Sequence, residues 1–318
     1  MRGSARGAWS PAIQNRQLGT LAGLVALSVL LWILTPHFLT VSNLVNVLEQ
    51  TSINAVIAVG MTFVIISGGI DLSVGSIVAF SGVVLGSALR ADVPVPVAIG
   101  AALAAGTVCG LANGLMITWG RLAPFIATLG MMSVARGVAL LWAEGRPISG
   151  FDSSFRVLAT GRLVILPAPV LIAAAIYVLG HFILTRTVFG RYAYSIGGNE
   201  EATSLSGVPI RLHKTAVYVM SGLVSGAAAV ILTARLNSAQ PTAGVMYELD
   251  AIAAAVIGGT SLRGGEGSLP GTFIGALIMG VLRNGLNLLD VSSFLQQVVI
   301  GLVIIGAAII DGTLRRRT

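Results

Sequence analysis

Long apolar runs separated by short polar segments occupy almost the whole chain. A helix that crosses a bilayer needs about 20 mostly apolar residues, and most of the runs approach this length. The pattern predicts about ten spans, at residues 18–34, 53–66, 77–89, 94–118, 124–142, 163–184, 215–234, 249–259, 271–289 and 294–310. Residues 38–50 alternate polar and apolar positions, which predicts an interfacial helix before the second span. We therefore predict an all-α membrane protein, a polytopic bundle of about ten transmembrane helices over residues 18–310, with short tails at 1–17 and 311–318.

Two of the apolar runs are interrupted by glycine. Segments 64–82 and 256–275 each run from apolar residues through a glycine pair and a polar turn to apolar residues again. The pairs are Gly68-Gly69 and Gly258-Gly259. Irregular backbone at membrane depth is tolerated where protein or a water-filled cavity satisfies it, and matching interruptions in two halves of a transporter point to its pathway. Tight cytoplasmic turns, with glycine for close packing, are the alternative.

The longest polar segment between spans covers residues 185–214, and its centre has the signals of a short helix. Asn199 suits the N-cap, and Glu200 and Glu201 follow in the first turn, where acidic groups interact well with the helix dipole. Gly207 suits the C-terminal cap. About two turns of helix are not stable alone in water. The segment is therefore either a solvated loop or a helix that docks on a cytoplasmic partner.

Composition and charge support a membrane protein. Of the 318 residues, 55% are hydrophobic and only 10% are charged, whereas soluble proteins carry about a quarter charged residues. The net charge of +7 is spread over loops, so a nucleic-acid-binding face is not predicted. With the N-terminus inside, 12 basic residues fall in cytoplasmic segments and 5 in outer loops. The positive-inside rule then places both termini and segment 185–214 in the cytoplasm.

A few polar residues lie within or beside the apolar runs. Asp71 is costly in a membrane and is a functional candidate, although it also suits a cap of the following helix. Asn113, Asn284 and Asn287 either bond neighbouring helices or line a polar route. We expect Asp71 and these three asparagines to approach one another around a polar cavity. Candidates for the translocation pathway are Ser67, Asp71, Asn113, Asp250, Asn284 and Asn287.

Other residues are assigned structural roles or none. Arg136 and Arg283 lie near the outer ends of their spans, and we expect them to snorkel outward. Cys109 is the only cysteine, so no intrachain disulfide forms, and the three histidines are far apart in sequence. No metal site and no catalytic nucleophile–base pattern is predicted. The sequence Gly-x-x-x-x-Gly-Lys-Ser/Thr is absent, so this chain does not hydrolyse ATP through a phosphate loop.

Several motifs together resemble one family. They include Ser67-Gly68-Gly69-Ile70-Asp71-Leu72-Ser73 and Gly258-Gly259-Thr260-Ser261-Leu262, with further matches at residues 60–65, 74–76, 125–129, 197–200, 238–244 and 247–254. Over residues 20–310 the chain resembles the membrane permeases of bacterial ATP-binding-cassette importers for simple sugars, and within them the ribose-transporting members. Arg263 and Glu266 in the second glycine loop depart from the pattern.

The resemblance implies a multi-pass inner-membrane transport subunit that is not itself an enzyme and binds no cofactor. It implies three partners besides lipid: a second permease subunit, identical or not, a cytoplasmic ATPase that binds ATP, and a periplasmic sugar-binding protein. The helix beginning after Asn199 then resembles the coupling helix that enters a groove on the ATPase. The residues assigned to this coupling are Gly197, Gly198, Asn199, Glu200, Glu201, Ala202, Leu205 and Gly207.

The expected substrate is ribose or a similar pentose, imported by alternating access. A hexose, a nucleoside or a signalling furanose is an alternative within the same class. An ion-coupled secondary transporter is an alternative from another class. It would need an ion site inside the membrane, for which Asp71 and Asp250 are the candidates.

Overall fold

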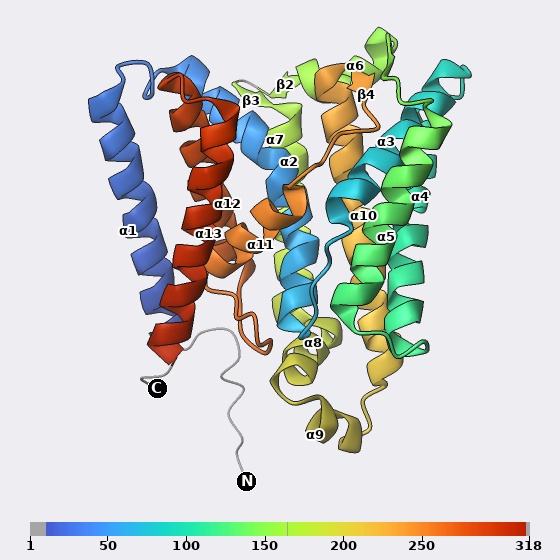
Figure 1. Cartoon of the computed structure of the whole chain (residues 1–318), viewed down its shortest axis with the longest axis vertical. Coiled ribbons are helices and arrows are strands. Elements are labelled where there is room, and N and C mark those ends of the chain that lie inside the picture. Colours follow the sequence, from blue (N-terminus) through green and yellow to red (C-terminus); the bar gives the residue numbers. More distant parts are fainter. Residues whose placement is uncertain (1–10, 164, 316–318) are drawn as a thin grey trace.

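The computed structural model describes residues 11–163 and 165–315 and consists almost entirely of helices (Figure 1). The helices are α1 (Pro11–Leu34), α2 (Val41–Ile66), α3 (Val74–Arg90), α4 (Val95–Thr118), α5 (Pro124–Trp142), α6 (Ser153–Thr160), α7 (Ala168–Arg186), α8 (Val188–Gly198), α9 (Glu200–Leu205), α10 (Ile210–Leu236), α11 (Tyr247–Ile257), α12 (Leu269–Leu288) and α13 (Ser293–Arg315). Four two-residue strands form two antiparallel pairs: β1 (Ile148–Ser149) with β4 (Ser238–Ala239), and β2 (Arg162–Leu163) with β3 (Leu166–Pro167).

The all-α class is confirmed, but the count of ten spans is not. Within the described residues, seven helices are long and apolar enough to cross a membrane: α1, α2, α4, α5, α7, α10 and α12. Helices α3 and α13 contribute shorter apolar stretches, and α11 has only 11 residues. The expected interfacial helix at 38–50 is not separate. Thr40 caps a continuous helix α2, accepting from the backbone N–H of Asn43, and this helix continues to Ile66.

Helix α2 lies at the centre of the bundle, with buried residues on all sides from Thr51 to Ile66. It packs against α7, α10, α11 and α12. At the edge, α1 contacts α12 and presents large apolar side chains outward. A helix that is apolar all round suits the core of a membrane bundle, whereas α1 has the outward-facing apolar surface of a lipid-facing helix.

Glycines set a close and extensive helix contact between α4 and α10. Gly106, Gly110 and Gly114 recur every fourth residue on α4. A Cβ on Gly106 would lie 2.3 Å from the carbonyl oxygen of Gly222, and one on Gly110 would lie 2.3 Å from that of Tyr218. Small residues at this spacing let helix backbones approach in membranes, where packing rather than water exclusion drives association.

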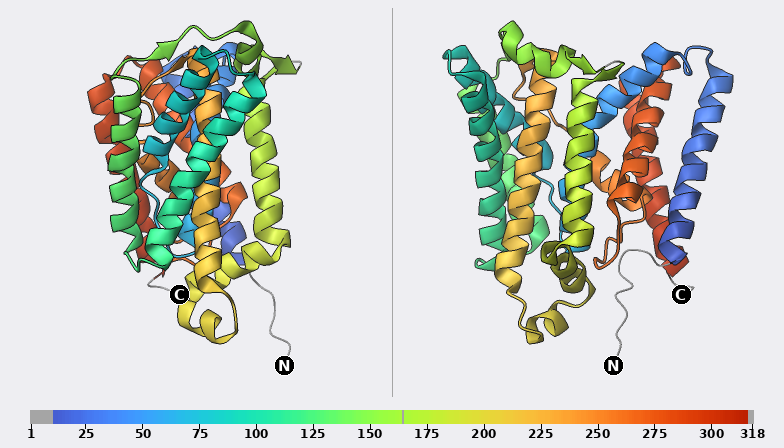
Figure 2. Two further views of the ribbon diagram at one scale, coloured as in Figure 1. Left: turned by 90° about the vertical axis from the view of Figure 1, so that its right-hand side faces the viewer. Right: turned by 180° about the vertical axis from the view of Figure 1, so that it is seen from behind.

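The two ends of the bundle differ (Figures 1 and 2). Helices α8 and α9 protrude at one end, where α1 begins and α13 ends. Helix α6 and the short strands cover the opposite end. The arrangement agrees with the expected grouping of segment 185–214 with the ends of the first and last helices. We refer to the α8–α9 end as the coupling end and to the other as the outer end, after the roles expected of them from the sequence.

Both glycine interruptions are real breaks in helices. Helix α2 ends at Ile66 and α3 begins at Val74, while α11 ends at Ile257 and α12 begins at Leu269. Segment 67–73 rises from the coupling end to the start of α3 inside the bundle, and segment 240–246 descends from the outer end to the start of α11 (Figure 1). Helices α3 and α11 therefore begin within the bundle, not at its ends.

Candidate coupling and transport sites

The short helix α9 forms as its sequence predicts. The side chain of Asn199 accepts a hydrogen bond from the backbone N–H of Ala202 at 2.9 Å. Glu200 and Glu201 occupy the first turn. Gly207 comes after the last turn in the left-handed region, with φ of +82°, and its N–H bonds the carbonyl of Ser204. The cap assignments of Asn199 and Gly207 are thus confirmed.

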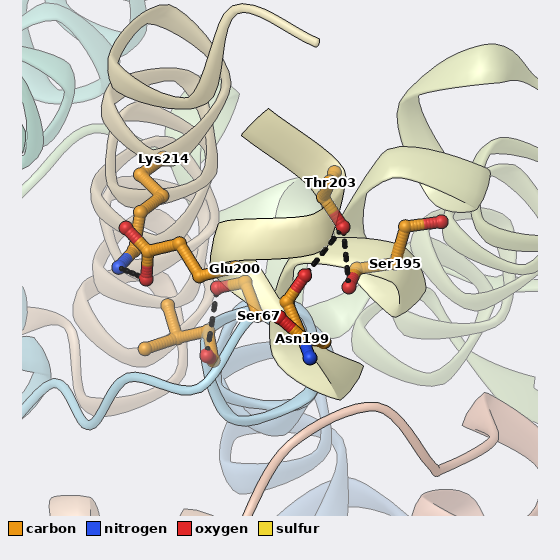
Figure 3. Close-up of polar contacts among 7 residues, drawn as sticks. Ser67, Ser195, Asn199, Glu200, Thr203 and Lys214 are labelled. Carbon is orange, nitrogen blue, oxygen red and sulfur yellow. Dashed lines mark hydrogen bonds and ion pairs between the residues drawn. The ribbon is translucent and has the colours of Figure 1, made fainter. Parts of the chain in front are cut away.

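One face of α9 is held inward and the other is open. The hydroxyl of Thr203 donates to the carbonyl oxygens of Ser195 and Asn199, at 2.9 and 2.7 Å, which fastens α9 to α8 (Figure 3). Lys214 of α10 pairs with Glu200 at 2.7 Å. Leu205, at the tip, is 85% exposed, and Ala202 is also exposed. An exposed leucine on a tethered helix is a suitable contact for a partner groove.

A cavity of about 910 Å³ lies beside this helix. Its walls come from the end of α4, the α4–α5 turn, α9 and the start of α10, and include Trp119, Arg121, Glu201, Arg211 and Lys214. The charged groups are mixed in sign, so the surface around α9 suits a protein partner with both acidic and basic side chains.

Five glycines join the coupling end to both broken segments. We call Gly68, Gly197, Gly198, Gly264 and Gly265 the glycine junction. A Cβ on Gly197 would lie 1.8 Å from the carbonyl oxygen of Ile66 and 2.6 Å from the amide nitrogen of Gly265. That amide donates to the same Ile66 oxygen at 2.9 Å. The end of α8 is therefore wedged between the end of α2 and the loop after α11.

Glycine is required at four of the five positions of this junction, for two reasons. Gly68, Gly264 and Gly265 have φ values of +80°, +84° and +74°, where a side chain is strained. At Gly197 the reason is contact distance, since no side chain fits between the backbones. Tyr194 adds a side-chain tie, because its hydroxyl donates to the carbonyl of Gly267 at 2.7 Å. Ser67, a pathway candidate, bonds the carbonyl of Val64 within the cap of α2.

Asp71 is the centre of a buried hydrogen-bond network. Its Oδ1 accepts from the backbone N–H and the hydroxyl of Ser73, at 3.0 and 2.6 Å. Its Oδ2 accepts from the hydroxyl of Ser221 on α10 at 2.8 Å. Asn113 on α4 donates to Ser73 at 2.8 Å. Asp71 is fully buried, so these bonds offset the cost of removing its carboxyl group from water.

The other candidates form separate groups. Asp250 accepts from Nη2 of Arg283 at 2.8 and 2.7 Å and from Asn54 at 3.1 Å. Asn284 and Asn43 exchange two hydrogen bonds, at 2.9 and 2.8 Å, between α12 and α2.

Asn287 accepts from Gln296 of α13 at 2.8 Å. Asp71 and Asn113 thus meet in one network, but Asn284 and Asn287 bond other helices, contrary to the expected gathering of all four. The side chains of Asn284 and Asn287 form their hydrogen bonds with polar side chains of adjacent helices, Asn43 of α2 and Gln296 of α13.

The expected outward snorkelling of Arg136 and Arg283 is wrong. Nη1 of Arg136 donates to the backbone oxygens of Pro241 and Ala243, at 2.8 and 2.6 Å. Arg283 pairs with Asp250. Arg136 reaches acceptors on the irregular backbone before α11, and Arg283 reaches a carboxylate on α11. These interactions hold both side chains inside the bundle, so neither extends toward water.

Sequence reasoning missed Ser73, Ser221 and Tyr194 as members of these sites. Ser73 lies two residues after Asp71, the spacing of a local side-chain turn, and that signal was available. Ser221 lies in an apolar helix rich in small residues, which predicts helix packing and gives no hint of a carboxylate partner.

Comparison with known proteins places the chain in a family. The family described as "Branched-chain amino acid transport system / permease component" matches residues 43–308. The match covers most of the chain, and the chain belongs to this permease family. It is therefore a transport component and a multi-pass protein of the inner membrane. No solved structure matches it.

Three relatives are similar over nearly their whole length. Ribose import permease protein RbsC of Escherichia coli strain K12 is 49% identical over 295 residues, 91% of this chain and 92% of the relative. The protein of the same name from Bacillus subtilis strain 168 is 48% identical over 298 residues, 93% and 92% of the two chains. That of Haemophilus influenzae is 46% identical over 295 residues, 92% and 91%. The resemblance to sugar permeases is confirmed.

Proposed function

We propose that this chain is the membrane-spanning subunit of an ATP-driven importer and carries ribose into the cytoplasm by alternating access. The observation that carries the proposal is the identity of 46–49% to three ribose import permeases, over more than 90% of this chain. Because the aligned residues cover 91–93% of this chain, they include both broken segments and helices α8 and α9.

Energy enters the chain through α9. The sequence has no phosphate loop, so a separate cytoplasmic ATPase binds and hydrolyses ATP. Its groove receives α9, with Leu205 and Ala202 as contacts, and its closure displaces α8. Because Gly197 is wedged between backbones, displacement of α8 moves the end of α2 and the loop after α11 together.

Three further partners complete the importer. A second permease subunit pairs with this one, a periplasmic sugar-binding protein delivers ribose at the outer end, and lipid surrounds the pair. Ser67, Asp71, Asn113 and Asp250 stay pathway candidates, because they lie on or next to the broken segments. Asn284 and Asn287 are weaker candidates, since each is already bonded to a neighbouring helix.

Reconstitution tests the proposal directly. The permease is placed in proteoliposomes with its ATPase and binding protein, and uptake of radiolabelled ribose is measured with and without ATP. We expect uptake that requires ATP, both partners and no ion gradient. Uptake without the ATPase, driven by an imposed proton or sodium gradient, would support an ion-coupled transporter instead. Preferential uptake of L-arabinose or D-allose in the complete system would overturn the choice of ribose.

A further inference from the structure

Four charged side chains lie inside the bundle around the first turns of α11, with Asp250 facing α12 and α2 and Glu248 facing α3 and α5. Arg283 pairs with Asp250, Arg136 bonds the backbone just before α11, and Glu248 lies within electrostatic range of both Arg136 and Asp250. Glu248 also approaches the start of α3, because a Cβ on Gly75 would lie 2.7 Å from its Oε2. We call Arg136, Glu248, Asp250 and Arg283 the α11 charge cluster.

The cluster lies at membrane depth. Helix α12 has 20 residues, about 30 Å or one hydrocarbon thickness, and Arg283 lies five residues before its last residue. Arg136 lies six residues before the end of α5, about 9 Å along the helix. Helix α11 itself begins inside the bundle, between α13 and α5 in the view of Figure 1.

The cluster is not sealed within the chain. The side chain of Arg283 is 33% exposed, and Arg136 and Glu248 are partly exposed. The neighbouring segment 240–246 exposes Thr242 and Val245, the latter by 62%. A charged side chain facing hydrocarbon is costly, and irregular backbone does not face lipid. This side of the molecule therefore faces water or protein.

The formal charges of the cluster cancel, with two guanidinium groups against two carboxylates. Such a surface favours neither an anion nor a cation. It does offer fixed donors from Arg136 and Arg283 and acceptors from Glu248 and Asp250. A neutral polyhydroxy compound, whose hydroxyl groups both donate and accept, matches this set of groups.

We infer that the α11 charge cluster is a hydrogen-bonding station for the sugar inside the membrane, with Glu248 as the group that contacts sugar hydroxyls. Glu248 has the role because its carboxyl group is bonded by backbone groups of its own helix turn, at Glu248 and Met246, whereas Asp250 is held by the side chains of Arg283 and Asn54 and Arg136 by two backbone oxygens. The inference rests on the proposed function, in which a second permease subunit closes this side and leaves an aqueous path.

Substitution of Glu248 tests the station in the complete importer. Ribose uptake and ATP hydrolysis are measured together in proteoliposomes for wild type, Glu248→Gln and Glu144→Gln, the last an exposed residue of the outer end. Loss of one hydrogen bond to a charged group lowers Glu248→Gln uptake about tenfold, with ATP hydrolysis within about twofold of wild type and Glu144→Gln unchanged. Unchanged uptake in Glu248→Gln, or uptake and hydrolysis falling together, would overturn the inference. Failure of wild type to import ribose would instead refute the proposed function.

Accessibility gives an independent test. Cys109 is the only cysteine, so a Cys109→Ser background permits single labelling sites. Thr242→Cys lies beside the cluster, and Val134→Cys lies on an outward-facing part of α5. A membrane-impermeant thiol reagent should modify Thr242→Cys in the assembled importer at least about tenfold faster than Val134→Cys, because the thiolate that reacts does not form in lipid. Equal, slow rates at both positions would show that no aqueous path reaches this side.

Discussion

The two broken segments end their first helices in the same way and then differ. At the end of α2, Gly68 N–H bonds the Ile65 oxygen and Gly69 N–H bonds the Val64 oxygen. At the end of α11, Gly259 bonds Val256 and Thr260 bonds Ala255 in the same pattern. Both are helix stops with a glycine in the left-handed region, Gly68 at +80° and Gly259 at +92°.

Beyond these stops the chain takes two different courses. After α2, it turns back into the bundle, where Asp71 accepts from the hydroxyl groups of Ser73 and of Ser221 on α10, and Asn113 of α4 bonds Ser73. After α11, the loop stays at the coupling end, where Gly264 and Gly265 contact the end of α8. The same stop thus produces a buried side-chain network in one segment and a backbone contact in the other. We infer that the first segment shapes the interior and the second receives motion, with Gly197 touching both.

We expect the largest effect from a change that disrupts the proposed contact between α9 and the ATPase, because both broken segments are linked to that contact through α8. In Leu205→Asp, a charge would lie in the proposed ATPase groove, and an unpaired buried charge costs several kcal/mol. We expect at least about 100-fold weaker association with the ATPase and loss of ribose uptake, while membrane insertion continues.

Co-purification of the ATPase with the permease measures the association. Leu163→Asp, an equally polar change at an exposed leucine of the outer end, is the matched control for association. If Leu205→Asp binds the ATPase and transports as well as wild type, α9 is an ordinary loop and not a coupling element.

The second largest effect is expected at the glycine junction, where two neighbouring glycines differ in whether an added Cβ would meet other backbone atoms. Gly197→Ala places a Cβ against the Ile66 oxygen and the Gly265 nitrogen, so backbones must move apart, at a cost of about 1–3 kcal/mol for overpacking. We expect the ATPase still to bind, since α9 is intact, but ribose uptake per ATP hydrolysed to fall. Gly198→Ala is the control, because a Cβ there meets nothing within 4 Å. Equal coupling ratios in the two variants would remove the junction from the mechanism.

A third change affects the first segment alone. Asp71→Ala leaves the hydroxyl groups of Ser73 and Ser221 without their acceptor, and we expect about 1–2 kcal/mol of lost stability from hydrogen bonds between membrane helices. Asp71→Asn keeps one acceptor oxygen and should lose less. Thermal unfolding of the purified permease in detergent measures both. Similar melting of Asp71→Ala and wild type would mean that the network does not hold α3 in place.

The smallest effect is expected at the ion pair beside the junction, which contacts neither broken segment. Glu200 is 54% exposed and Lys214 is 14% exposed, and solvent screens such pairs to about 0–1 kcal/mol. Lys214→Met should therefore change the melting temperature and the ATPase association only slightly. A loss as large as that of Leu205→Asp would assign the pair a direct part in binding the ATPase.

Parts of this architecture derive from local sequence alone. The positions of the seven long apolar helices, the breaks at Gly68 and Gly258, and the cap of α9 at Asn199 depend on hydropathy and on interactions within a few residues, so one-dimensional patterns predict them. The continuous helix α2 was missed because its polar first turns lie at the outer end of the bundle, where hydropathy falls without a break in the helix.

The partners of polar groups inside the membrane were decided only by tertiary structure. The sequence alone predicts that Arg136 and Arg283 extend outward and that Asn284 lies near Asp71. Which acceptor lies within reach depends on how α10, α11 and α12 pack around α2, over separations of 33 residues for Arg283–Asp250 and 150 for Ser221–Asp71. The meeting of Gly197 with Ile66 and Gly265 has the same origin. The sequence therefore determined where the long apolar helices lie, where the chain breaks and where α9 is capped. Packing determined which polar and glycine residues meet, because hydrogen bonds and backbone contacts between helices act over distances in space that no local pattern encodes.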